Sequence, residues 1–590
     1  MRKAARSVKT RTVTVPSPVG GLDALNSLAA MPPTNAVVMD NLVPGVNSCA
    51  IRDGYKSAVT GFAASVETLM PYNAYAGSKL FACSGTSFYD ASLVGAVGAA
   101  VVTGLSNARW EHVNFGTIGG QFLICANGTD AMRIYDGSKW MKYTDGTGLT
   151  IASITRVGTL ATLTTTAPHG LATGQTVTVA GATPSQYNVT AATITVTGAT
   201  TFTYVMASDP GASASPVGTL TITFPVITGV NTALIKDVQV YANRVWLIEK
   251  NSFRVWYLPL NSIAGAASSI DFSSLCILGG SLAGMVTWFV NSEFGAITYA
   301  AFVTTQGEVL LYQGSDPSNA ATWTKTGQFR IGRPIGQRFY ERVGNDTLLI
   351  TADGIIPMSK ASITDRQTQS DAISFNVTQL VGDDIAVYGN NFGWQVILYP
   401  FGNKIFLNVP RNAPSENIQY VMNTITNKWC RYTGLAAKCW ALYNDNIYFG
   451  SSTSVNQAEF GNDDNGAAIT MTCVPAFSYF GAPGAVKLFT AARPTINANG
   501  SYTPKIGMSF DFQTTPSVSS PMTNISGDIA VWDAVKWDIT PWAAPAAISR
   551  KLQWVGGSGF AASMTIASST KGMKVEWLST DFIFEIGGSL

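Results

Sequence analysis

Residues 301–360 carry the strongest fold signal in this chain: AFVTTQGEVLLYQGSDPSNAATWTKTGQFRIGRPIGQRFYERVGNDTLLITADGIIPMSK. Two strand–turn–strand units stand in this stretch. The first turns at Gln306-Gly307 and the second at Asp353-Gly354, and apolar β-forming residues flank both turns. Such turns are typical of compact hairpins. Repeated hairpins at this spacing predict stacked antiparallel sheets.

The segment between the two hairpins contains Gly332-Arg333-Pro334. Proline removes a backbone donor and cannot continue a helix, so no helix is expected there. The apolar residues of the segment are scattered. We therefore expect an ordered connector without a strand of its own.

Similar hairpins recur along the chain at a measurable period. Phe81 and Phe122 occupy matching places 41 positions apart, and Phe302 and Leu348 do so 46 positions apart. A four-stranded propeller blade spans about 40 to 50 residues. The period therefore predicts an irregular β-propeller, and the lack of a WD or GH signature leaves its blade number open.

Two parts of the chain depart from this rhythm. Residues 149–224 are rich in Thr, Ala, Gly and Val, carry hardly any charge and alternate like half-exposed strands, so we expect a small inserted β-domain. Its His169 is expected in a turn rather than as a metal ligand. After residue 461 the period stops and five tryptophans follow, Trp532, Trp537, Trp542, Trp554 and Trp577, which favour core or subunit contacts over a sugar platform.

The predicted fold class is all-β: an irregular β-propeller with an inserted small β-domain and a C-terminal β-sandwich or platform. One short helix is expected at residues 36–42, before Pro44-Gly45. The expected organisation runs in chain order: an N-terminal extended arm with the first platform elements at 1–60, the first part of the propeller at 61–148, the inserted β-domain at 149–224, the second part of the propeller at 225–461, and the C-terminal β-platform at 462–590.

Composition limits the classes of function. Hydrophobic residues make up 46% of the 590 residues, charged residues only 12%, and the net charge is +2. The near-neutral balance argues against broad polyanion binding by the whole chain. The low charge indicates either a surface covered by other subunits or a coat of Ser, Thr and Asn. The basic N-terminal cluster is either a solvated arm or an arm that orders against a neighbouring subunit.

No motif predicts catalysis, a metal site or a cofactor. Seven cysteines stand far apart without a CxxC pair, and only His112 and His169 are available as histidine partners. Such spacing fits neither a zinc site nor a disulfide scaffold, so reduced thiols are expected. Phosphate loops and metalloprotease motifs are absent from the sequence. The paired acids at 383–384 and 463–464 stand among Gly and Asn and are expected in turns.

One polar group invites a functional hypothesis. Arg330, Arg333, Arg338 and Arg342 lie on and after the connector, just beyond Lys325. Guanidinium groups grip phosphates and pair with carboxylates across subunits, for which Glu308, Glu341 and Asp353 are candidates. Three alternatives stay open: a solvated surface strip, a subunit contact, and the lining of a DNA channel.

Several short segments of the sequence resemble those of a known family. YQGSDPSNAATW, RIGRPIGQR and DGIIPMS occur in this order within residues 312–359; GGLDALNSLAAMPPTNAVVMDNLVP and RDGY open the chain, and WVGGSGF and DFIFEIGGSL close it. In word order the chain resembles the nozzle, or tail tubular, proteins of short-tailed bacteriophages. Residues 149–224 are the main departure, although APHGLATGQTVTVAGA resembles a β-module of phage structural proteins.

That resemblance implies a role and partners. Nozzle proteins form hexameric rings below the head-to-tail adaptor in the virion tail, retain the packaged double-stranded DNA in their lumen, and offer attachment to tail fibres or spikes. The expected function is thus a structural conduit and gate that meets the host cell envelope at ejection, with no enzymatic activity and no cofactor. The alternative is a receptor- or glycan-binding tail protein on a propeller scaffold.

Overall fold

The computed structural model describes the chain except for residues 1–9, 76, 144–149, 167–168, 170, 172, 199, 223–225, 293–294, 363–371, 501, 515–519, 522–546 and 588–590. The described chain is all-β apart from a few single-turn 3-10 segments and two helices, α1 (Met358–Ala361) and α2 (Thr378–Tyr388). None of the described helices has the length and apolarity needed to span a bilayer.

The chain forms two compact units. Unit 1 comprises Met1–Val66, Leu93–Ala96 and Ile331–Leu590, and unit 2 comprises Glu67–Ser92 and Val97–Arg330. The division between Arg330 and Ile331 falls inside the predicted connector. It also divides the segment predicted as the second part of the propeller, 225–461, between the two units.

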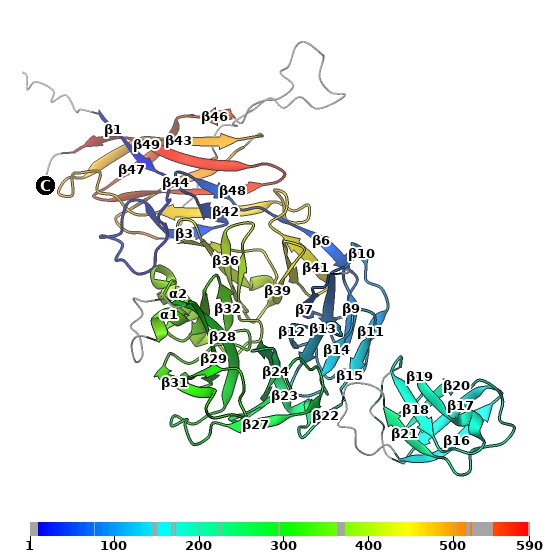
Figure 1. Cartoon of the computed structure of the whole chain (residues 1–590). Coiled ribbons are helices and arrows are strands. Elements are labelled where there is room, and N and C mark those ends of the chain that lie inside the picture. The colour runs from blue at the N-terminus through cyan, green and yellow to red at the C-terminus, as the bar shows by residue number, and fades with distance from the viewer. Residues whose placement is uncertain are drawn as a thin grey trace, which may run out of the picture. The chain divides into compact units, whose positions relative to one another are not determined.

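Unit 2 contains four antiparallel sheets of four strands, each a simple meander of the type found in propeller blades. We number these blades in chain order (Figure 1). Blade 1 has β7 (Val66–Tyr72), β8 (Lys79–Ser84), β9 (Ser87–Asp90) and β11 (Ala100–Val102); blade 2 has β12 (Glu111–Thr117), β13 (Gly120–Ala126), β14 (Arg133–Tyr135) and β15 (Trp140–Lys142); blade 3 has β23 (Ile235–Tyr241), β24 (Arg244–Glu249), β25 (Arg254–Tyr257) and β27 (Ser268–Asp271); blade 4 has β28 (Leu282–Ser292), β29 (Gly295–Thr304), β30 (Glu308–Gly314) and β31 (Trp323–Arg330). A small pair, β22 (Ile227–Thr228) and β26 (Gly265–Ala266), lies beside blade 3 in sequence.

The blades pack face to face through alternating side chains. In β13, Leu123 and Cys125 join a buried cluster with blade 1, whereas Ile124 joins a separate cluster with blade 3. In β24, Leu247 faces blade 2 and Trp246 packs with blade 4. The period-2 alternation of a strand thus places a hydrophobic layer on both faces of each middle blade. These clusters account for the apolar hairpins of the sequence.

The residues that marked the predicted period hold equivalent positions in successive sheets. Phe81 and Phe122 both lie on the second strand of their blades, β8 and β13, and Phe302 lies on the second strand of blade 4. Leu348 holds the same position in the next sheet, β32 (Tyr340–Val343), β33 (Asp346–Thr351) and β34 (Gly354–Pro357). The hairpin turns at Gln306-Gly307 and Asp353-Gly354 are confirmed.

The prediction for the connector was wrong, because β31 and β32 are strands. β31 pairs with β30 along its length, but only Trp323 and Phe329 of β31 are buried. A strand at the edge of a sheet needs few apolar residues, because its backbone hydrogen bonds hold it on one side. In β31, one buried side chain near each end of the strand adds to this pairing. Its apolar residues therefore look scattered in the sequence.

An Asp-x-Ser turn follows the third strand of three blades. Asp136 accepts hydrogen bonds from Ser138 N and Oγ at 2.8 and 2.7 Å, and Asp316 accepts from Ser318 N and Oγ at 3.2 and 2.8 Å. Asp90 binds Ser92 in the same way. Such Asx turns satisfy backbone donors locally. They constitute an internal repeat of the blades that was not predicted from the sequence.

The inserted module has its own core. Its six strands form one sheet in the order β16–β17–β20–β19–β18–β21 and enclose a cluster that includes Leu163, Val177, Phe202 and Tyr204. The strand bounds are β16 (Ile151–Val157), β17 (Leu160–Thr165), β18 (Thr176–Ala180), β19 (Val189–Val196), β20 (Thr201–Val205) and β21 (Thr219–Ile222). The expectation of a small all-β domain at this position agrees with these strands.

In unit 1 a strand from the N-terminal part of the chain completes a sheet. β6 (Tyr55–Thr60) pairs antiparallel with β41 (Ser454–Ala458), beyond which lie β40 (Asn446–Gly450) and β39 (Cys439–Tyr443). β10 (Gly95–Ala96) adds to the other side of β6. Another meander, β35 (Gln395–Tyr399), β36 (Lys404–Val409), β37 (Ile418–Asn423) and β38 (Lys428–Tyr432), continues through β3 (Asn35–Asp40) into a larger sheet.

The C-terminal part is built from two layers (Figure 1). One sheet contains β1 (Thr10–Pro16), β4 (Leu42–Pro44), β5 (Cys49–Ile51), β43 (Lys487–Ala498), β46 (Ala547–Ser549), β47 (Gln553–Gly559) and β49 (Val575–Ile586), and the other contains β2 (Gly21–Leu22), β3 (Asn35–Asp40), β42 (Ile469–Pro475), β44 (Lys505–Phe510), β45 (Ser520–Pro521) and β48 (Ala562–Thr570). The ring of Phe480 lies 5.1 Å from those of Phe489 and Phe582. Strands from both ends of the chain therefore share one sandwich.

The helix expected at residues 36–42 was wrong. Residues 35–40 form β3, which pairs with β42, and residues 42–44 form β4. Tertiary pairing overrides the weak local preference here. Of the five C-terminal tryptophans, Trp577 is buried and Trp554 is 73% exposed. Trp532, Trp537 and Trp542 lie outside the described residues.

Candidate functional site

The predicted arginines lie on different elements. Arg330 ends β31 in unit 2, whereas Arg333, Arg338 and Arg342 belong to unit 1. Arg338 lies over the ring of Phe392 at 5.3 Å from its centroid, and Arg342 Nε donates to the carbonyl of Gly344 at 3.3 Å. Arg333 and Arg342 are exposed. The predicted group is thus divided between the two units, and Arg338 and Arg342 have separate local partners.

Two of the three carboxylates proposed as their partners, Glu308 and Glu341, accept hydrogen bonds from backbone groups. Glu308 is 1% exposed, and its two oxygens accept from the backbone N–H groups of Ile277 and Leu278 at 3.1 Å each. Glu341 accepts from the backbone N–H of Leu398, and burial raises its pKa to about 7. Glu308 is therefore committed inside its own unit and is not available to a neighbouring subunit.

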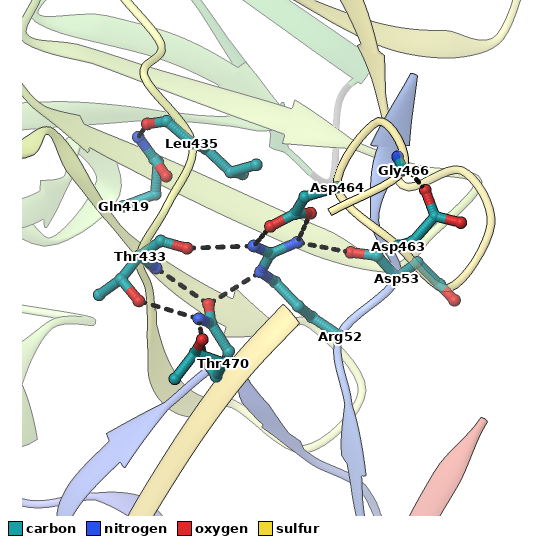
Figure 2. A network of polar contacts seen from close by, with 10 residues as sticks. Arg52, Asp53, Gln419, Thr433, Leu435, Asp463, Asp464, Gly466 and Thr470 are labelled. Carbon is teal, nitrogen blue, oxygen red and sulfur yellow. Dashed lines mark hydrogen bonds and ion pairs between the residues drawn. The ribbon is translucent and has the colours of Figure 1, made fainter. Parts of the chain in front are cut away.

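The most connected polar centre is formed by Arg52 (Figure 2). Its side chain makes a two-pronged ion pair with Asp464, with Nη–Oδ distances of 2.8 and 2.7 Å. Nε donates to Asn41 Oδ1 at 2.8 Å, and the remaining donors reach the carbonyl oxygens of Asp53 and Thr433 at 3.0 Å each. All five N–H donors are satisfied although Arg52 is only 2% exposed. Such geometry is what a buried guanidinium requires.

Asn41 extends this centre to a further segment. Its Nδ2 donates to Thr433 Oγ1 at 2.8 Å and to the carbonyl of Thr470 at 2.7 Å, while its Oδ1 also accepts from the backbone of Thr433. Arg52, Asn41, Thr433, Asp464 and Thr470 thereby join the N-terminal part of the chain to residues up to 429 positions away. We call this group the Arg52 junction.

The backbone beside the junction leaves no room for a side chain at Gly54. A Cβ atom there would lie 1.8 Å from the carbonyl oxygen of Asp463. The Tyr55 N–H donates to the same carbonyl at 3.1 Å, and Asp463 Oδ1 accepts from Gly466 N at 2.6 Å. The acidic pair 463–464 therefore lies in a turn, as the sequence predicted, and Asp464 is also an ion-pair partner. The same prediction was wrong for the pair 383–384, which lies in α2.

A cavity of about 450 Å³ adjoins Arg52 in unit 1. Charged groups of both signs line it, among them Asp53, Lys404, Lys574 and Glu576. Lys404 pairs with Glu459, and Glu576 accepts from Ser48 and from Asn497. Charges of both signs thus line the cavity, and those of Lys404 and Glu576 are already engaged by protein groups.

A second polar group lies in unit 2 where the first strands of successive blades are neighbours. Asp237 on β23 is 7% exposed, and burial together with the nearby Glu111 carboxylate on β12 raises its pKa to about 7. Raised carboxyl pKa values occur at catalytic sites and at structural ones alike. Among the described residues, no group of three or more His, Cys, Asp or Glu side chains has metal-binding geometry.

His169 is fixed by backbone groups. Its Nδ1 accepts from Leu171 N at 3.0 Å, and its Nε2 faces the carbonyl oxygens of Gly198 and Thr201 at 3.1 and 3.3 Å. Nε2 therefore carries the proton, and both ring nitrogens are occupied. Burial lowers the pKa of His169, which favours the neutral ring. Its role is structural.

Sequence comparison offers no assignment, because no protein-family model and no curated protein matches this chain. Among solved structures, similar ones include a glycoside hydrolase family 43 arabinoxylan arabinofuranohydrolase from Bacillus subtilis (TM-score 0.23, 11% identity, 92% of this chain and 95% of that chain) and YCF48 bound to D1 peptide (TM-score 0.23, 8% identity, 72% and 98%). Another is a putative 6-phosphogluconolactonase from Bacteroides fragilis (TM-score 0.24, 9% identity, 62% and 91%). At these scores the similarity carries no argument about function, and the blade architecture is established by the strand order described above.

The Arg52 junction was missed as a site by sequence reasoning. The segment RDGY contributed only to the family resemblance, and Asp464 was predicted only as a turn residue. An aspartate 412 positions from an arginine gives no signal in a single sequence. The one hint in the sequence is Gly54, because a glycine is typical of places where two backbone segments approach closely.

Proposed function

We propose that this chain is a structural virion protein that forms the distal tail tube, or nozzle, of a short-tailed bacteriophage. It would act as a conduit and gate for the genome and as an attachment point for fibres or spikes. The proposal starts from the resemblance in the sequence. It is supported by the position in the fold of the residues that carry that resemblance.

Several of those residues fix the structure of the chain, Arg52 between distant segments and Asp23 within its own loop. Arg52 of RDGY is the centre of the Arg52 junction. Asp23 of the opening word is 1% exposed and accepts from Leu25 N, Asn26 N, Asn26 Nδ2 and Asn35 Nδ2 at 2.6–3.1 Å. Gly557 of WVGGSGF has no room for a Cβ, which would lie 2.1 Å from the ring of Phe510. These sequence segments contain residues that stabilise the fold and do not form a catalytic pocket in the described part of the chain. This favours a structural role for the protein.

The low charge also supports assembly. With 12% charged residues, much of the surface can be covered without burying unpaired charges. In a cyclic ring each subunit uses two different patches, and the exposed Arg333 and Arg342 of unit 1 are our candidates for a subunit contact or for contact with DNA. The partners would be further copies of this chain, expected as six, the head-to-tail adaptor, and fibres or spikes.

Electron microscopy of virions with this chain labelled tests the proposal. We expect density for a closed six-copy ring on the tail axis, below the adaptor. Localisation at the tail periphery would overturn the assignment and favour the alternative, a receptor- or glycan-binding protein. A glycan array with the purified chain separates that alternative, since selective sugar binding is expected only from a receptor-binding protein.

A further inference from the structure

The inserted module presents an outer sheet face with an unusual composition. Residues directly opposite each other on neighbouring strands point to the same face. Thr155 of β16 pairs with Thr162 of β17, Thr162 pairs with Thr203 of β20, and Thr203 pairs with Thr195 of β19. Four threonines therefore form an uninterrupted row across four strands.

Two further rows flank this one. On one side Val157 pairs with Leu160 and Leu160 with Val205, and these side chains are 82%, 43% and 68% exposed. On the other side Ser153 pairs with Thr164 and Thr164 with Thr201, whose hydroxyl lies 3.1 Å from that of Thr197. We call these three rows the threonine face.

The threonine face carries no charged and no aromatic side chain at any of these described positions. Exposed sheet faces usually carry Lys or Glu, which disfavour association. Arg156 lies on the opposite side of β16, where it pairs with Asp209. A charged partner would lose hydration on this face without gaining a counter-charge. The face therefore fits a neutral partner.

We propose that the threonine face is a self-association surface that packs against the same face of a second copy of this chain. Two identical faces share the same twist and neutrality, so a two-fold contact brings no like charges together, and sheets pack face to face at about 10 Å. Sugar-binding surfaces usually offer aromatic rings, which are missing from the described positions of this face. The proposal does not depend on the tail role.

The expected contact is weak. With strands about 4.8 Å apart and about 3.3 Å per residue, the face measures roughly 300 Å². Two faces would bury roughly 600 Å², below the roughly 1,200 Å² of a stable pair. The contact would therefore be transient in dilute solution and would gain strength where copies are held together.

Disulfide trapping detects such a contact in the full-length chain. All seven native cysteines are buried and free, so a thiol introduced at the half-exposed Thr203 can be followed alone. We expect T203C to form disulfide-linked dimers about tenfold faster under mild oxidation than T221C, because the contact raises the effective concentration of the paired thiols. Thr221 is an exposed threonine on β21, beyond the threonine face, and is the matched control.

Two more variants keep the test decisive. T162C should behave like T203C, and T155K in the T203C background should lower dimer formation to the rate of T221C. Circular dichroism confirms that each variant is folded. Equal rates for T203C and T221C, or trapping unaffected by T155K, would overturn the proposal. If added dextran protects the thiol of T203C from alkylation while no dimer forms, the face binds a glycan instead, which would also overturn it.

Discussion

Arg52 and Asp464 form a buried, two-pronged ion pair although 412 positions separate them in the sequence. The Arg52 side chain is 1% exposed and that of Asp464 12%. Arg52 precedes β6, the strand that completes the sheet with β41, and Asp464 follows that same sheet. The pair therefore fixes the start of β6 to the turn that follows β41.

Loss of this pair is expected to be costly. Asp464→Ala would leave a buried guanidinium without its counter-charge, which typically destabilises a protein by about 3–5 kcal/mol. Urea unfolding of the purified variant measures this loss. The matched control is Asp463→Asn in the same turn, because an asparagine oxygen can still accept from Gly466 N. A control loss as large as that of Asp464→Ala would show that the turn, and not the ion pair, is responsible.

Gly54 is expected to tolerate no side chain. Gly54→Ala places a Cβ against the Asp463 carbonyl, so β6 or the 461–466 turn must shift, at a cost of about 2 kcal/mol or more. Thermal unfolding checks the prediction. Gly484→Ala, where no atom lies within 4 Å of the added Cβ, should change the unfolding temperature little. Similar unfolding temperatures for the two variants would contradict the steric explanation.

Much of the fold could be predicted because its signals are local. The apolar hairpins and their period gave the blades, since a blade is one meander of about 45 residues. The Asp-x-Ser turns at Asp136 and Asp316 were equally local and could have been found by aligning the blades. Strand β31 could not be predicted in this way, because an edge strand that is held by backbone pairing has no apolar pattern of its own.

The candidate site was less predictable. Sequence proximity grouped four arginines, but the fold gives Arg338 and Arg342 separate local partners and places Arg330 in another unit. Glu308 looked like a surface partner, whereas its two oxygens bind backbone N–H groups. Pairing over long sequence distances depends on tertiary packing, and a single sequence does not encode it in a readable pattern.

The inserted module should be removable. The chain leaves the blade 2–blade 3 cluster at Tyr143 and rejoins it at Ile227, so both ends of the insert belong to one packed region, while the module buries its own core. Replacing residues 149–224 with a short Gly-Ser bridge should leave a soluble protein that unfolds cooperatively. Insoluble expression, or a broad transition in calorimetry, would show that the module supports the blades.

The thiols should be unreactive in the native protein. Burial raises the pKa of Cys49 to about 12 and that of Cys276 to about 11, and the thiolate is the reactive form. Ellman's reagent at mildly alkaline pH should therefore label few thiols in native protein and all seven after denaturation without reductant. Two or more missing thiols in the denatured sample would reveal a disulfide, and rapid native labelling would contradict the burial.

The last prediction concerns the pH dependence of stability in unit 2. Burial and the Glu111 carboxylate raise the pKa of Asp237 to about 7, above its ordinary value of 3.8. Between these values the folded state holds a proton that the unfolded state releases, so the stabilisation is full below about pH 4 and is lost as the pH rises through about 7. Asp237→Asn removes this loss, because the amide stays neutral. From about pH 5 to about pH 8 the wild type should lose about 2–3 kcal/mol relative to the variant. Glu341→Gln is the matched control, since Glu341 in unit 1 also has its pKa raised to about 7 and should act on the unfolding of that unit with the same sign. Urea unfolding at several pH values, with tryptophan fluorescence as the probe, measures both. A constant difference between wild type and Asp237→Asn across this range would show that Asp237 is already ionised in the folded protein at the acidic end of it.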